Sequence, residues 1–307
     1  MTHRLLAPVI AVTLSVLAAS SIRVSAWGNE GHRAVARVAL SVSPGLSAKV
    51  QSLMNADLVS VATCADEVRE LEQGKITALT VTCAAIFPKP PTGTANGHFI
   101  DLDVHKPSMN DAAIDAFCKT KKICAVERIL FFQKQLRTLA PKKDNASVLA
   151  RRQALAFITH FVGDIHQPLH AAERDNDFGG GGVNVQFSHQ TTVLHSVWDS
   201  GVMRNVTSSD SLFVNGLATE IAAAKTEKVP ADVSHWVHQW ARDSQALAIA
   251  HAYRDIAGTT VVEIPRKAAP PFPLLSARYE AIALADIKSQ IAKAGFRLAT
   301  LLESALP

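Results

Sequence analysis

One stretch, from His160 to His170, constrains this chain more than any other. It reads HFVGDIHQPLH and places three histidines and an aspartate within eleven residues. The mostly apolar run before it, residues 148–157, contains no Gly or Pro and predicts a buried helix that continues into the stretch. His160 and Asp164 would then lie one turn apart on one helix face, where an imidazole nitrogen and a carboxylate oxygen can bind the same divalent ion. The alternative is a core helix whose histidines bond backbone carbonyls.

The other two histidines of the stretch are expected to have different roles. Pro168 should kink or end the helix, so His170 would leave the face that carries His160 and bind a different ion. His166 also lies off that face, and we interpret it as a structural residue or as a support for a ligand.

A second pair of candidate ligands repeats the spacing of the first. His195 and Asp199, in the sequence LHSVWDSG, are again four residues apart and follow the first pair by about thirty residues. Two pairs with the same spacing favour a site that binds more than one metal ion.

Further candidates precede the stretch. Asp66 and Arg69 share one face of a helix predicted over about residues 63–71, although Asp66 alone is typical of a first-turn residue that interacts with the helix dipole. The segment His98–Asp101 follows a loop rich in Pro, Gly and Thr and is predicted to be short and extended. A loop histidine followed by an aromatic residue suits a metal ligand beside a stacking surface, but Phe99 could equally belong to the core.

The periodicity of the rest of the chain favours a mainly α fold. Ala, Leu and Val recur at helical spacing, whereas alternating strand patterns are scarce. Helices are predicted over residues 32–42, 232–257 and 274–303, the last two separated by a Pro-rich loop. Because no Gly/Ser linker, repeat or low-complexity tract divides the chain, we expect one domain over residues 27–307.

Residues 1–26 are typical of a secretory signal peptide. Arg4 precedes an apolar run over residues 5–22, and the small-residue sequence at 24–26 suits cleavage. The alternative is an uncleaved membrane anchor, for which the run is barely long enough and is interrupted by a proline and polar residues. Removing this segment takes away Arg4 and Arg23 and no acidic residue, so 31 basic residues fall to 29 against 27 acidic ones, a net charge of +2.

So small a charge excess excludes the general basic surface that sequence-independent nucleic-acid binders use. Attraction for phosphate would have to be local, and bound metal ions would supply it. If Ala26 is the last signal residue, the mature chain begins at Trp27, and its free α-amine lies five residues from His32. An amine and its own carbonyl oxygen can chelate a metal ion, and His32 could complete the coordination of that ion. A single early histidine is, however, more often structural.

The chain contains four cysteines. An even number in an exported chain favours disulfides over zinc thiolates. Cys118 with Cys124 would close a short loop and leave Cys64 with Cys83, but the spacing alone does not establish this pairing.

The candidate residues occur in the order Trp27, His32, Asp66, His98, the stretch from His160 to His170, His195 and Asp199. In this order the sequence resembles the zinc-dependent S1/P1 nuclease family. The resemblance covers the mature chain, including residues 294–299, which look like the last helix of the family. It implies a mainly α, compact multi-helix domain of the phospholipase C and P1 nuclease type, with a short β-hairpin or loop region.

The resemblance also implies three Zn²⁺ ions. One would be bound by Asp66, His98, His160 and Asp164, a second by His170, His195 and Asp199, and a third by the amine and carbonyl of Trp27, His32 and the bridging Asp164. Zinc would activate a water and stabilise charge on the phosphate. By the same resemblance Asp164 and Asp66 take part in catalysis, and Arg69, where the family often has lysine, would neutralise phosphate charge. The alternative for Arg69 is a surface charge.

The family's nucleotide pocket matches the chain at Phe99, which would stack on a base, and at Asp101, which would bond it. Stacking requires a base that has left its duplex neighbours, which implies a preference for single strands. The chain departs from the family at Gly181, where an asparagine is usual. This removes a side-chain contact near the base, so the resemblance leaves base preference open.

The sequence thus predicts a secreted or periplasmic zinc endonuclease that hydrolyses single-stranded RNA and DNA to 5′-phosphorylated products, with 3′-nucleotides as further candidate substrates. We expect a monomer without a stable protein partner or a membrane span after processing. One alternative is a lipid phosphodiesterase like zinc-dependent phospholipase C, which tends to carry Glu at the position of Asp199. A remoter alternative is a zinc-binding protein without turnover, against which the ligand set, Arg69 and Phe99 argue.

Overall fold

The computed structural model describes residues 27–307 except residues 108, 122 and 258–259. The predicted signal peptide lies outside the described residues. In chain order the helices are α1 (Asn29–Val42), α2 (Leu46–Met54), α3 (Leu58–Val61), α4 (Cys64–Glu72), α5 (Val81–Ile86), α6 (Asp111–Lys121), α7 (Ala125–Thr138), α8 (Asn145–Ile165), α9 (Leu194–Ser196), α10 (Val202–Val206), α11 (Asp210–Asn215), α12 (Ala218–Ala224), α13 (Val233–Leu247) and α14 (Ala277–Ala305). Between them lie the 3-10 turns η1 (Ala95–His98) and η2 (Pro168–His170) and the π-helical turns η3 (Val197–Gly201) and η4 (Ala248–Ala252).

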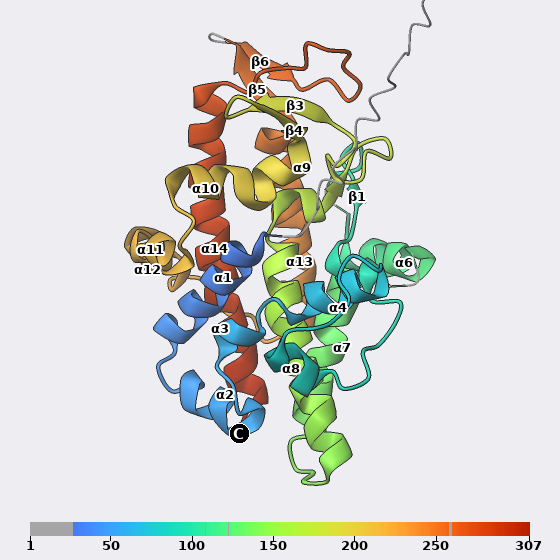
Figure 1. Cartoon of the computed structure of the whole chain (residues 1–307), viewed down its shortest axis with the longest axis vertical. Helices are drawn as coiled ribbons and strands as arrows, with labels where there is room; N and C mark the ends of the chain where they lie inside the picture. The colour runs from blue at the N-terminus through green and yellow to red at the C-terminus, as the bar shows by residue number, and fades with distance from the viewer. Residues whose placement is uncertain (1–26, 108, 122, 258–259) are drawn as a thin grey trace, which may run out of the picture.

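The strands form three small two-stranded sheets within the described residues. β1 (Leu102–Asp103) pairs in parallel with β2 (Ala172–Glu173), β3 (Asn184–Phe187) pairs antiparallel with β4 (Gln190–Val193), and β5 (Arg254–Ala257) pairs antiparallel with β6 (Thr260–Glu263). The two antiparallel hairpins lie at one end of the molecule, while α8 and α14 run along its long axis (Figure 1). The predicted mainly α fold is confirmed.

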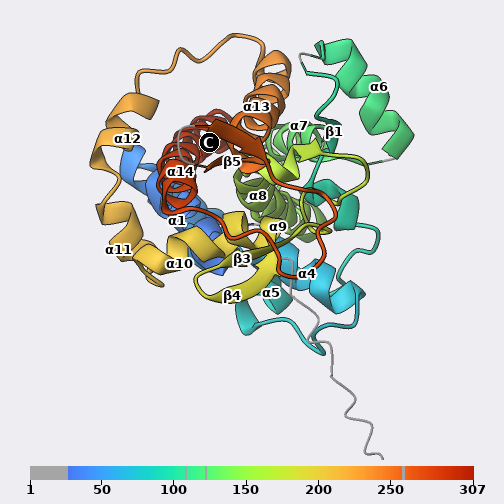
Figure 2. The same ribbon diagram turned by 90° about the horizontal axis from the view of Figure 1, so that it is seen from above.

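Helix α8 is the centre of the fold. Viewed from above, it lies among α1, α4, α7, α13 and α14, all of which contact it (Figure 2). Every residue from Ala154 to Ile165 is buried, which is typical of a helix enclosed on all sides. Asp144 caps the helix by accepting a hydrogen bond from Ser147 N at 2.9 Å. The helix ends at Ile165, before Pro168, so His170 sits in the separate turn η2, as predicted.

Two of the predicted segments are wrong in part. The helix predicted over residues 232–257 ends at Leu247, and residues 254–257 form β5, because their backbone groups pair with β6 instead of continuing the helix. The segment predicted to be extended at His98–Asp101 is extended at Phe99 but not at its two ends, because His98 ends η1 and Asp101 has a positive φ of 52°. This turn at Asp101 leads into β1, where Leu102 pairs with Ala172.

Two disulfides confirm the expected cysteine chemistry. Cys64–Cys83 joins the start of α4 to α5, and Cys118–Cys124 joins the end of α6 to the start of α7. The first closes a loop with a sequence separation of 19, for which chain entropy alone gives about 3 kcal/mol of stabilisation. This bond holds α4, which carries Asp66, against the segment that follows it.

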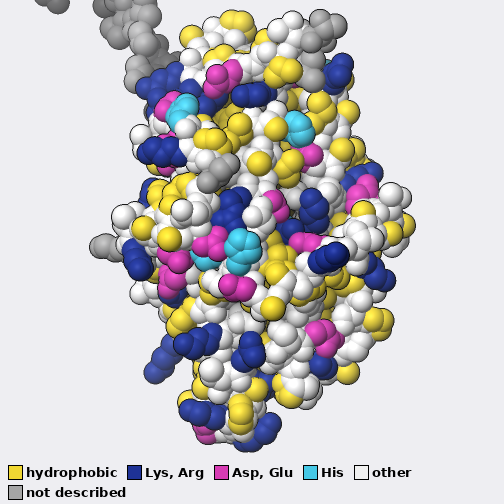
Figure 3. Space-filling view, turned by 180° about the vertical axis from the view of Figure 1, so that it is seen from behind, with side chains coloured by type: hydrophobic (Ala, Val, Ile, Leu, Met, Phe, Trp, Pro, Cys, Tyr) yellow, Lys and Arg dark blue, Asp and Glu magenta, His cyan; other side chains and the backbone are white. Residues whose placement is uncertain are grey.

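Charge is mixed over the face seen in Figure 3, where Lys and Arg side chains alternate with Asp and Glu. This agrees with the small net charge of the sequence and with a local origin for any attraction of phosphate. Across the described residues, no helix combines the length and the apolar character needed to cross a membrane.

Candidate metal centre

Four donor side chains from α4, η1 and α8 converge into a first group. His98 Nδ1 lies 3.1 Å from His160 Nε2 and 3.0 Å from Asp164 Oδ2, while Asp66 Oδ1 lies 3.6 Å and 3.4 Å from the two histidine atoms. His160 Nε2 lies 3.3 Å from Asp164 Oδ2. A tetrahedral zinc with ligands at 2.0–2.1 Å separates its ligand atoms by about 3.3 Å. Asp66, His98 and His160 could therefore hold one metal ion, and Asp164 lies within 3.3 Å of both histidines.

A second group combines His170 from η2 with His195 and Asp199. Their atoms are again closely spaced: His170 Nε2 lies 3.1 Å from His195 Nε2, which lies 3.2 Å from Asp199 Oδ2. His195 belongs to α9, whereas Asp199 lies in the π-helical turn η3. Such turns add a residue to a helix and occur often at functional sites. The three residues could hold one metal ion.

A third group forms on the other side of Asp164. His32 Nε2, on α1, lies 3.3 Å from Asp164 Oδ1, the oxygen that does not face His98. His32 also stacks on His160 with ring centroids 3.7 Å apart. Trp27 is fully buried, and its indole N–H donates to Gly163 O at 2.7 Å. The two oxygens of Asp164 thus face two different groups.

Backbone carbonyls determine which nitrogen of His160, His170 and His195 points into the groups. The bonds are His160 Nδ1 to Ala62 O at 2.8 Å, His170 Nδ1 to His98 O at 2.8 Å, and His195 Nδ1 to Gly179 O at 2.7 Å. Because a carbonyl only accepts, each Nδ1 is assigned a proton, and each Nε2 is the nitrogen that is left to face a metal ion. The Nε2 atoms of His170 and His195 lie 3.1 Å apart. A metal ion between them could be bound by both.

Several buried polar atoms of the groups have no hydrogen-bond partner within the described structure. They include both ring nitrogens of His32, Asp164 Oδ1 and Asp199 Oδ2. Buried polar atoms are rarely left unpaired, and these nitrogen and carboxylate oxygen donors are the ones that zinc prefers. The residues present therefore fit zinc.

Charge is concentrated at Asp164. Burial opposes its ionisation, yet the neighbouring histidines, His160 foremost, hold the pKa of Asp164 well below its usual range. Burial likewise opposes a charge on His160, but Asp164 and Asp66 raise the pKa of His160 to about 10. Burial and the cation of Arg69 lower the pKa of His98 to about 3. The carboxylates thus draw positive charge into the cluster, which a metal ion can supply in place of a proton.

Arg69 is buried beside the first group. Its Nη2 lies 2.6 Å from Asp66 Oδ1, one turn along α4, and only 8% of the residue is exposed. The alternative of a surface charge is therefore wrong. The guanidinium is held where it can neutralise negative charge near the metal groups.

Of the two residues matched to a base pocket, Asp101 lies near His170 and His195 of the second group, and Phe99 directly follows His98 of the first. Phe99 is half-buried between the buried His98 and Ile100, so its ring is not part of the core. Burial and the nearby Glu173 raise the pKa of Asp101 to about 6.

A glycine loop supports His195. An added Cβ at Gly179 would lie 2.2 Å from Leu169 O, and Gly179 has a φ of 57°, so only glycine fits there. Phe178, just before it, also has a φ of 57° and is 76% exposed. In the sequence, the position of Phe178 before the glycine run is the only signal for this exposed aromatic side chain.

His166 lies outside the three groups, as predicted. Its Nδ1 bonds Val162 O at 2.7 Å, and its Nε2 faces Arg297 Nη1 at 2.8 Å. The first bond stays within α8, and the second joins the end of α8 to α14.

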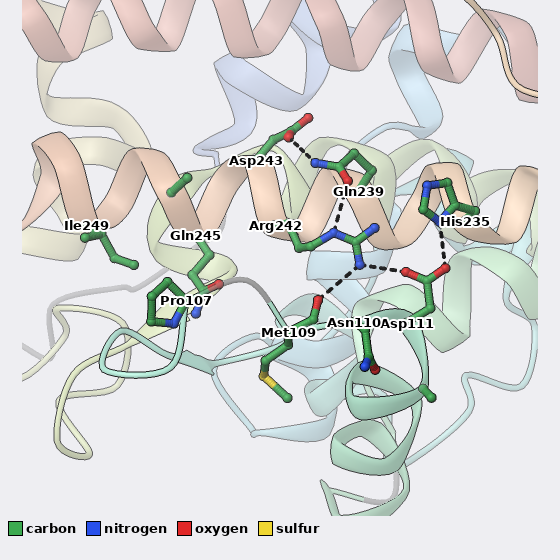
Figure 4. A pocket seen from close by; sticks show the side chains of 12 residues that line it. Pro107, Met109, Asn110, Asp111, His235, Gln239, Arg242, Asp243, Gln245 and Ile249 are labelled. Carbon is green, nitrogen blue, oxygen red and sulfur yellow. Dashed lines mark hydrogen bonds and ion pairs between the residues drawn. The ribbon is translucent and has the colours of Figure 1, made fainter.

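A wide cavity of about 770 Å³ lies elsewhere, between α6 and α13. Figure 4 shows Arg242 pointing toward Asp111, with Nη1 2.6 Å from Oδ1, and His235 bonding the same carboxylate at 2.8 Å. Arg242 and His235 of this cavity both pair with Asp111, and none of the candidate ligands lines the cavity. The metal groups remain the better candidate for the chemistry.

Comparison with known proteins agrees with this geometry. The family model for S1/P1 nuclease matches residues 27–307. Nuclease S1 of Aspergillus oryzae is 30% identical over 208 residues, which cover 66% of this chain and 62% of that protein. Endonuclease 3 of Arabidopsis thaliana is 27% identical over 252 residues, covering 76% and 78%. Nuclease P1 of Penicillium citrinum is 26% identical over 292 residues, covering 89% and 95%. The chain therefore belongs to the S1/P1 family of zinc-dependent nucleases.

Proposed function

We propose that this nuclease is an exported trinuclear-zinc phosphodiesterase that cleaves single-stranded RNA and DNA internally and leaves 5′-phosphorylated products. The observation that carries the proposal is the position of Asp164, whose two oxygens face His98 at 3.0 Å and His32 at 3.3 Å. One zinc would be bound by Asp66, His98, His160 and Asp164, a second by His170, His195 and Asp199, and a third by Trp27, His32 and Asp164. The free α-amine of Trp27 would become available as a ligand only after residues 1–26 are removed.

The residues around the ions have distinct roles in this proposal. Zinc supplies Lewis acidity, which stabilises charge on phosphate oxygens and makes a water nucleophilic near neutral pH. Asp66, besides serving as a ligand, orients the attacking water and accepts its proton. Arg69 places a permanent positive charge beside the transferred phosphate, where its planar guanidinium can bond two oxygens.

The preference for single strands follows from how the base is held. Phe99 offers a partly exposed aromatic face, and Asp101 offers a carboxyl group that can bond a base edge. Any base can stack on Phe99, but the base must first leave the nucleic-acid duplex. Gly181 adds no side-chain contact: an added Cβ there would meet only backbone and Cβ atoms of Phe178 and Asp177. We therefore expect weak discrimination among bases.

Export is supported by the two disulfides, because such bonds persist in oxidising compartments. It would also release the amine of Trp27. We expect a monomer that acts on 3′-nucleotides as well as on polynucleotides.

Metal analysis combined with activity measurements tests the proposal. The mature protein should contain about three zinc ions and cleave denatured DNA and RNA much faster than duplex DNA. Chelation should remove activity, and added zinc should restore it. Phosphatidylcholine serves as the control substrate. Hydrolysis of the lipid in preference to denatured DNA, or unchanged nuclease activity in the zinc-free protein, would refute the proposal.

A further inference from the structure

A cleft of about 280 Å³ opens onto the metal groups. The residues that line it include Asn29, Asp66, Ser196, Asp199, Ser200 and Arg204. Because Asp66 belongs to the first group and Asp199 to the second, the cleft borders both. A nucleic-acid chain whose scissile phosphate reaches the ions must therefore pass through or beside it.

Most of the charged residues that line this cleft are acidic. Glu67 and Glu70 line it on α4, outside the metal groups. Glu67 accepts hydrogen bonds from Thr80 N at 2.8 Å and from its hydroxyl at 3.1 Å, which keeps its carboxylate in place. Among the described residues that line the cleft, Arg204 alone carries a positive charge. A second phosphate that entered here would be repelled unless a cation met it.

Arg204 is available for that role. It lies on α10 with 56% of its side chain exposed, and its Nη2 is 3.4 Å from Glu30 Oε2. An exposed ion pair of this length is weak, so the guanidinium can turn from Glu30 to a phosphate at little cost. Ser196 lines the same cleft and offers a neutral donor, because its buried Oγ has no hydrogen-bond partner within the described structure.

We propose that Arg204, together with the hydroxyls of Ser196 and Ser200, forms a subsite for a phosphate next to the scissile one. The inference rests on the proposed nuclease function and adds to it a preference for oligonucleotides over substrates with a single phosphate. The planar fork of arginine suits bidentate contact with phosphate oxygens.

Three matched substrates test the subsite: the dinucleoside monophosphate TpT, and the same molecule with an added 5′-phosphate or 3′-phosphate. Cleavage of the internal diester is followed by chromatography as kcat/KM. The wild-type enzyme should cleave one of the two phosphorylated substrates with a higher kcat/KM than TpT. Arg204→Ala should reduce this ratio of kcat/KM values roughly three-fold, which is the effect expected for the loss of one partly exposed charge contact. For that substrate, the slope of log kcat/KM against log salt concentration should become shallower by about 0.7, as expected when one phosphate contact to a single strand is lost.

Arg37→Ala is the matched control, because Arg37 is also exposed and pairs with an acid, Asp210, at 2.9 Å but outside the cleft. It should leave the preference as in wild type. Arg204→Lys keeps the positive charge but not the planar guanidinium, so it should lose part of the preference for the phosphorylated substrate. If Arg204→Ala does not fold, Arg204→Lys is used in its place. An equal loss on all three substrates, or an unchanged preference, overturns the subsite. Failure of wild type to cleave TpT in a zinc-dependent way would instead refute the proposed function.

Discussion

Substitution of Asp164 by Asn tests the link between the ions most sharply. Asn retains one carbonyl oxygen but replaces the other by an amide nitrogen, whose lone pair is delocalised and cannot bind zinc. Because the two oxygens of Asp164 face His98 at 3.0 Å and His32 at 3.3 Å, one group loses a ligand whichever way the amide turns. Both groups also lose a negative charge in a fully buried position.

The size of the effect can be bounded from metal-site chemistry. Removal of a residue that only supports a zinc ligand costs 10–100-fold in metal affinity or activity. A bridging ligand should exceed this, so we expect at least about 100-fold weaker binding in the affected group, about 2.7 kcal/mol. The purified Asp164→Asn protein should then contain about two zinc ions or fewer and should retain roughly 0.1% of wild-type activity or less.

Elemental analysis and initial rates on denatured DNA are the assay, with circular dichroism to verify folding. Asp255→Asn is the control, because Asp255 is also buried but accepts hydrogen bonds from the backbone N and the hydroxyl of Ser276, away from the ligands. It should keep its zinc and its activity. A folded Asp164→Asn protein with three zinc ions and normal rates would refute the bridging role.

Further predictions concern the base site and the glycine loop. Phe99→Ala should raise KM for single-stranded DNA by losing about 1 to 3 kcal/mol of stacking, with zinc content unchanged; loss of zinc would show instead that Phe99 supports the fold of the site. Gly179→Ala should lower the free energy of unfolding by more than about 1 kcal/mol, because its Cβ would lie 2.2 Å from Leu169 O, and should also weaken zinc binding through His195. A thermal melt and zinc analysis check it, and a wild-type melting temperature would contradict it.

Local sequence patterns were sufficient to predict the two His-x-x-x-Asp pairs as candidate metal ligands. Their members share an element or adjoining turns, so spacing alone predicted that His160 would face Asp164 and that Pro168 would separate His170 from them. Fold class was predictable for the same reason, since α8 and α14 are formed by local periodicity.

Long-range contacts could not be predicted in this way. The carbonyls that orient the histidines come from Ala62, His98 and Gly179, each distant in sequence from its partner. The error at β5 is of a different kind, because β5 pairs with its chain neighbour β6 and Ala257 lies opposite Thr260: residues 254–257 were assigned to the preceding helix although they begin a hairpin. The grouping of Asp66 and His98 with α8, and of His32 with Asp164, was predicted only through the family resemblance.

The zinc content of two forms of the chain tests the central claim most directly. The account requires that the amine of Trp27 complete the third site, and an amide nitrogen in an extended chain is a poor ligand. Protein that begins at Trp27 should contain three zinc ions by elemental analysis, and protein with one extra residue before Trp27 should contain about two and be nearly inactive until that residue is trimmed. Equal zinc content and equal activity in both forms would contradict the account.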